Sequence, residues 1–134
     1  MKQKDRKSVL PKEQGQPDIF AGGYDERLEA TRSLLHMDKN FDILYRELSV
    51  GGRRVSLFSI DGFLTGTVSE KVLEFFYSIE EKDMPQEFEG FMARFAPYGD
   101  ITAIDTQEDF VQLLLAGLTC FLIEGYQKVI AFDF

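Results

Sequence analysis

Residues 113–134 read LLLAGLTCFLIEGYQKVIAFDF, and this stretch decides how the rest of the chain is organised. It holds two dense apolar runs, separated by the polar segment 124–128. Each run is too short to cross a bilayer, and neither alternates as a strand with one face in water would. Such runs are typical of strands in the middle of a sheet that helices cover. The stretch therefore predicts two interior strands.

The sequence stops at Phe134, inside the second apolar run, and no polar tail follows it. Because chain termini are usually solvated, we expect this chain to be truncated from a longer protein. Nowhere does the sequence reach the roughly 18–20 apolar residues that span a membrane, and no apolar signal segment follows the basic N-terminus. We expect the piece itself to be soluble.

Charge is unevenly distributed along the 134 residues, which carry a net charge of −8. Residues 1–19 contain five basic and three acidic side chains, a net charge of +2, which leaves −10 for the remainder. A body this acidic repels phosphate, so the composition excludes nucleic acid as a partner. The lone cysteine, Cys120, lies in an apolar run and is interpreted as a small buried hydrophobe.

The first 23 residues are polar and punctuated by proline and glycine, which predicts a flexible arm in front of a single α/β subdomain at 24–134. A solvated tail is one interpretation of the arm. A weak contact of residues 1–19 with anionic lipid headgroups is the other, because each basic side chain near such a surface contributes about 1 kcal/mol.

The rest of the chain alternates between helical and strand patterns in the order α-β-β-α-α-(β)-α-β-β. Two strands flank Gly51-Gly52, a pair typical of a tight hairpin. Thr67 and Thr106 begin capping-box sequences, and Asp83 is predicted to cap a helix that has Pro85 in its first turn. The pattern predicts an α/β (α+β) fold, in which helices pack against a mixed sheet of four or five strands. The predicted elements are helices at 25–36, 67–79, 83–95 and 106–117, and strands at 41–50, 53–60 and 101–104 together with the two closing runs.

Motifs for catalysis and for cofactor binding are missing from the sequence. There is no phosphate-binding loop, no dinucleotide fingerprint, no nucleophile elbow and no zinc-protease motif. The single histidine, His36, is placed at the end of a helix and has no second ligand at metal-binding spacing. We therefore expect no enzymatic activity, no cofactor and no metal. Asp61 and Asp133 lie at predicted strand ends, where an acid can bind a ligand or form a turn.

Short motifs in a fixed order give the chain a resemblance to a known family, the GerA-type spore germination proteins. This family includes the A subunits of nutrient germinant receptors and stage V sporulation protein AF. The resemblance covers roughly residues 40–134. Its motifs are Phe41-Asp42-Ile43, Arg46-Glu47, Gly51-Gly52-Arg53, Ile60-Asp61-Gly62-Phe63, Ala96-Pro97-Tyr98, Leu114-Leu115-Ala116-Gly117 and residues 123–133.

The resemblance implies the first N-terminal soluble subdomain of a spore inner-membrane protein, facing the spore core. A second soluble subdomain and a membrane region would follow it, and the full-length protein would form homo-oligomers and contact other germination proteins. The expected role is non-catalytic: subunit interaction and regulation of germination and ion release.

Polar residues that we expect at such a contact, or at a ligand site, are Arg46, Arg53, Arg54, Asp61 and Asp133. The alternative function is a germinant-binding module, with a small metabolite held at the strand ends near Asp61 and Asp133.

Overall fold

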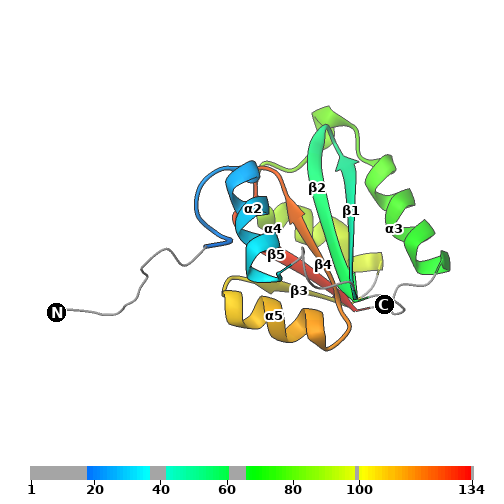
Figure 1. The fold of residues 1–134 in the computed structure, drawn as a ribbon. Coiled ribbons are helices and arrows are strands. Elements are labelled where there is room, and N and C mark those ends of the chain that lie inside the picture. The colour runs from blue at the N-terminus through cyan, green and yellow to red at the C-terminus, as the bar shows by residue number, and fades with distance from the viewer. Residues whose placement is uncertain (1–17, 37–41, 61–65, 99, 134) are drawn as a thin grey trace.

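The computed structural model of the chain describes residues 18–36, 42–60, 66–98 and 100–133 (Figure 1). Two short 3-10 helices, η1 (Glu81–Asp83) and η2 (Ala96–Tyr98), flank the helix at Phe88–Phe95. The main elements are α2 (Tyr24–Leu34), β1 (Ile43–Val50), β2 (Arg53–Ile60), α3 (Gly66–Ser78), α4 (Phe88–Phe95), β3 (Asp100–Ile104), α5 (Gln107–Leu115), β4 (Thr119–Ile123) and β5 (Val129–Asp133).

A single five-stranded sheet forms the centre of the fold, with the strand order β1-β2-β4-β5-β3. The α+β class with helices packed on the sheet is confirmed. Every neighbouring pair is antiparallel, however, so the expectation of a mixed sheet is wrong. Each pair is joined by a tight turn or by a long connection that reverses the strand direction, and no parallel crossover is needed.

Helices cover both faces of the sheet, which explains the apolar runs near the end of the chain. Side chains of α3 and α4 pack on one face, and side chains of α2 and α5 pack on the other (Figure 1). In β4, Phe121 and Ile123 are buried in the cluster under α3 and α4. Cys120 and Leu122 are buried in the cluster under α2 and α5. All five residues of β4 are buried. The prediction of two interior strands is confirmed.

Aromatic rings build the cluster between the sheet and the helices α3 and α4. Phe95 of α4 has no exposed surface and lies at its centre. Its ring stacks on Phe75 of α3 at 4.6 Å between centroids and approaches Phe132 of β5 at 4.9 Å. The rings of Phe76, Phe91 and Phe121 also contact it, at 5.9, 5.9 and 6.0 Å between centroids. One residue of α4 thus joins the neighbouring helix to two strands of the sheet.

Local sequence signals account for most of the element boundaries. Gly51 and Gly52 both have positive φ, as the predicted tight turn requires, and Val50 pairs with Arg53 across it. The Thr106 side chain accepts a hydrogen bond from the Asp109 amide at 3.1 Å, which confirms that cap. Helix α3 begins at Gly66, one residue before its predicted cap.

Helix α4 begins later than predicted. Met84 is extended, with φ −67° and ψ 122°, because the following Pro85 disfavours helical geometry at the residue before it. The carbonyl of Pro85 instead accepts a hydrogen bond from the Tyr126 hydroxyl in the turn between β4 and β5. The helix starts at Phe88, after Glu87, so the prediction that Asp83 caps it is wrong.

The folded body extends to the N-terminal side of Tyr24, where the predicted subdomain begins. Ile19 is completely buried in the cluster beneath α2 and α5, and its amide donates a hydrogen bond to the Gln107 side chain at 2.8 Å. Residues 18–23 are therefore part of the folded body, and residues 1–17 of the predicted arm lie outside the described residues. No helix in the described part of the chain has the length and apolar character needed to cross a bilayer.

Burial of Cys120 gives the protein a pH-dependent stability above neutrality. Burial raises the pKa of its thiol from the ordinary 9.0 to about 12. The unfolded chain therefore loses this proton at a lower pH than the folded chain, and the free energy of unfolding falls as the pH rises between those values. The slope approaches about 1.4 kcal/mol per pH unit. When the free energy of unfolding is measured with urea from pH 8 to 10, it should fall less steeply with pH in Cys120→Ala than in the wild type. Equal slopes in the two proteins would contradict this.

Candidate functional site

Two turns and one helix start meet at the same end of the sheet. The turn between β1 and β2 leads into Arg53, and the turn between β4 and β5 follows Ile123, which pairs with Val55 of β2. Helix α2 reaches this end through Asp25, which forms an ion pair with Arg54. We call the group the turn-end cluster; it consists of Tyr24, Asp25, Arg53, Arg54, Glu124 and Tyr126.

Arg54 is held at the surface by two carboxylates and an aromatic ring. Its guanidinium lies 2.9 Å from Asp25 and 3.5 Å from Glu124. Its Cζ lies 4.6 Å from the centroid of the Tyr24 ring, within the range of a cation–π contact. The hydrogen bond to Asp25 is the main cause that raises the pKa of Arg54. These contacts orient a fully charged guanidinium at the protein surface.

Arg53 is held differently, by stacking. Its Cζ lies 4.7 Å from the centroid of the Tyr126 ring, and Nη1 donates to the backbone carbonyl of Glu124 at 3.3 Å. The φ of Gly125, +96°, favours glycine, and a Cβ at this position would displace the Arg53 guanidinium, since it would lie 2.6 Å from Nη1. No carboxylate of the described residues forms an ion pair with Arg53, so its positive charge is available to a partner.

Beneath this surface lies a buried arginine that was not predicted from the sequence. Arg27 of α2 is only 2% exposed. Its guanidinium donates to the carbonyls of Ile19 at 2.8 Å, Tyr126, and Gln127 at 2.7 Å. Burial lowers the pKa of Arg27, but an arginine stays protonated in a protein. The available signal was its helical spacing, because Arg27 lies four residues before Thr31, which is also buried.

The five residues expected at a contact do not all come together. Arg53 and Arg54 both belong to the turn-end cluster at one end of the sheet, with their side chains on opposite faces of β2. Arg46 is exposed in the middle of β1, opposite Leu57, and Asp133 lies at the other end of the sheet, opposite Asp100 of β3. Asp61 lies outside the described residues. The cluster also includes Tyr24, Asp25, Glu124 and Tyr126, which were not predicted because only the fold brings them near the two arginines.

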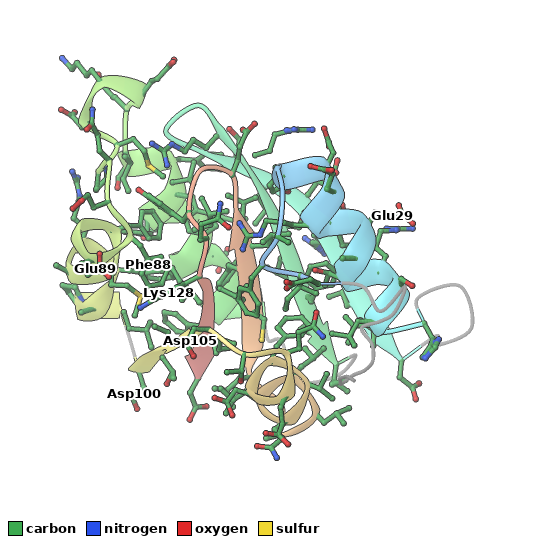
Figure 2. The ribbon with its side chains drawn as sticks, turned by 90° about the vertical axis from the view of Figure 1, so that its left-hand side faces the viewer. Glu29, Phe88, Glu89, Asp100, Asp105 and Lys128 are labelled. Atoms are coloured by element: carbon green, nitrogen blue, oxygen red, sulfur yellow. The ribbon has the colours of Figure 1, made fainter. Side chains whose placement is uncertain are left out.

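Acidic side chains elsewhere are spread around the body. Figure 2 shows Glu29, Glu89 and Asp100 well apart, on different elements. Lys128 follows the turn-end cluster and lies beside Phe88, with Nζ 6.0 Å from the ring centroid. Across the residues that the structure describes, no three His, Cys, Asp or Glu side chains are grouped so that they could hold a metal ion. The turn-end cluster presents two guanidinium groups that stack on buried tyrosines, and arginine is enriched at protein–protein interfaces.

One family model matches most of the chain. The model of a family described as Bacillus/Clostridium GerA spore germination protein matches residues 32–134, most of the chain. A similar solved structure is the N-terminal domain of the A subunit of the Bacillus megaterium spore germinant receptor GerK3, with a TM-score of 0.64 and 16% identity. The match covers 81% of this chain and 45% of that one, so this chain spans less than half of that domain. At this identity the likeness shows a shared fold. No curated protein matches significantly.

Proposed function

Because the chain belongs to the GerA family of spore germination proteins, we propose that it is a non-catalytic interaction module at the N-terminal side of a germination membrane protein. The observation that carries the proposal is the family match over residues 32–134. The fold shared with the N-terminal domain of a germinant receptor A subunit supports the same position in the full-length protein.

The partners of this module are the other parts of the same assembly. We infer a second soluble subdomain and a membrane region in the full-length protein, with further copies and other germination proteins around it. The module lies on the core-facing side of the spore inner membrane, and it regulates germination and ion release through these contacts. A contact with two arrangements that differ by a few kcal/mol is sufficient for such control.

The turn-end cluster is the part of the module best suited to such a contact. Arg53 and Arg54 are pre-oriented by Tyr126 and Tyr24, so little side-chain entropy is lost when they bind a partner. Arginine is also one of the residue types that contribute most often to binding energy at interfaces. An acidic surface on the neighbouring subunit or subdomain would complement Arg53.

The test is a pair of neutralised variants in the full-length protein. We expect Arg53→Gln to reach the spore membrane in normal amounts but to slow dipicolinate release several-fold and to weaken co-purification of its partners. Lys82→Gln is the matched control, since Lys82 is exposed and its ion pair with Glu80 is long, at 3.7 Å. Normal release and co-purification in Arg53→Gln would contradict a role for this cluster.

The germinant-binding alternative is separated from this proposal by a measurement on the chain alone. An interaction module should show no change of melting temperature with nutrient amino acids, sugars or dipicolinate. A ligand that binds the folded state would raise the melting temperature in proportion to the logarithm of its concentration. A saturable upward shift with one of these compounds would favour the binding module.

A further inference from the structure

Strand β1 is the longer edge of the sheet, and no strand of the described residues pairs with its outer side. The sheet order places β1 and β3 at the two edges, and β1 has eight residues against five in β3. Alternate residues of an edge strand direct their backbone N–H and C=O groups away from the sheet. Such an edge is a template for another strand, and proteins control this hazard with charged side chains.

Two opposite charges lie at the centre of β1. Arg46 and Glu47 are both exposed, with three residues of the strand before them and three after. Because they are adjacent, their side chains lie on opposite faces of the sheet. Glu47 accepts a hydrogen bond from the Tyr45 hydroxyl at 2.9 Å, and Arg46 has no ion-pair partner in the described residues. Any strand that pairs with the middle of β1 must therefore meet both charges.

A second copy of the chain cannot meet them favourably. Two identical edges pair antiparallel about a two-fold axis perpendicular to the sheet, and this axis keeps the same face upward in both copies. Residues directly opposite each other share a face, so the two residue numbers in every pair must add to an even number. The two longest registers then place Arg46 opposite Arg46, or Glu47 opposite Glu47. Like charges directly opposite destabilise a strand pair.

We propose that the β1 edge excludes a second copy of the chain and accepts an extended segment of a different protein with complementary charge. The partner residue opposite Arg46 should be acidic, and the one opposite Glu47 should be basic. Because the partner strand runs antiparallel, the basic residue comes directly before the acidic one in its sequence. The expected segment therefore reads basic–acidic in its centre, within a β-prone sequence. Strand addition of this kind takes affinity from the backbone and specificity from the side chains. It gives the module a second contact surface, separate from the turn-end cluster.

The charge rule can be tested with two peptides of identical composition, Thr-Val-Lys-Glu-Val-Thr and Thr-Val-Glu-Lys-Val-Thr, both capped at their ends. The wild-type chain should bind the Lys-Glu peptide about five-fold more tightly, since two cross-strand pairs change sign between the peptides. The backbone amide shifts should be centred on residues 43–50. The matched variant, Arg46→Glu combined with Glu47→Arg, should reverse the preference. An unchanged preference in this variant, equal binding, no binding, or shifts centred elsewhere would overturn the proposal.

Self-association provides the second test. The Arg46→Thr, Glu47→Thr double variant keeps good strand formers at both positions but removes the like-charge contacts. Its association constant for dimer formation, measured by sedimentation at low salt, should exceed that of the wild type about five-fold. The charge-exchanged variant should stay as monomeric as the wild type, because its registers still oppose like charges. A monomeric double-threonine variant, or a wild-type dimer that buries β1, would overturn the exclusion of a second copy. Both tests use the isolated chain, so their failure is distinct from failure of the germination assay.

Discussion

Replacing Arg27 with methionine is expected to lower the free energy of unfolding by about 3–5 kcal/mol. Methionine fills much of the same volume but cannot donate to the carbonyls of Ile19, Tyr126 and Gln127. Each buried carbonyl left without a partner costs about 1–3 kcal/mol, and relief from burying the charge offsets part of the sum. Urea unfolding followed by circular dichroism measures the effect.

Two further variants at arginine positions show whether geometry or charge causes the loss. Arg27→Lys keeps the positive charge but not the planar fork of donors, so it should lie between the wild type and Arg27→Met. Arg94→Met is the surface control, because Arg94 is exposed and makes one hydrogen bond of 3.3 Å to the Asp83 carbonyl. It should change stability by less than about 0.5 kcal/mol. If Arg27→Met is as stable as the wild type, the guanidinium is not what joins α2 to the turn between β4 and β5.

Replacing Phe95 with alanine is expected to destabilise the fold by about 3–5 kcal/mol. The ring has no exposed surface and lies between Phe75 of α3 and Phe132 of β5. Its removal leaves a cavity that the backbones of α4 and the sheet cannot close. The loss should appear in chemical unfolding as a lower midpoint with an unchanged slope.

Matched variants separate the cavity from the loss of aromatic contacts. Phe95→Leu restores most of the volume and should cost less than about 1.5 kcal/mol. Tyr77→Ala removes another aromatic ring, but one that is 71% exposed on α3, and should cost less than about 0.5 kcal/mol. Equal losses for Phe95→Ala and Phe95→Leu would show that ring contacts, rather than packing volume, dominate this cluster.

Local patterns in the sequence were sufficient to predict most elements of the fold. The closing strands β4 and β5 followed from apolar runs that only a doubly covered sheet can bury. The first hairpin followed from Gly51-Gly52, and the start of α5 from the Thr106 cap. These signals depend on nearby residues alone, so they can be interpreted without knowledge of the rest of the molecule.

Features that depend on distant residues were not predictable in the same way. The antiparallel order of the sheet depends on which strands pair across long connections, and the sequence pattern does not record this. Pro85 accounts locally for the extended Met84, but the hydrogen bond that the Pro85 carbonyl accepts comes from Tyr126, 41 residues later. The turn-end cluster joins α2, β2 and the turn between β4 and β5. Of its residues, only Arg53 and Arg54 could be predicted from the sequence.

The central position of β4 has a consequence for synthesis of the protein. Strand β2 finds its inner neighbour only at residues 120–123, more than sixty positions later, so a ribosome must release almost all of this sequence before the sheet can close. Until then β4 and β5 are missing from the face on which the phenylalanines of α3 and α4 pack. Folding dominated by such distant pairings is slow, and the nascent chain is exposed to aggregation during that delay.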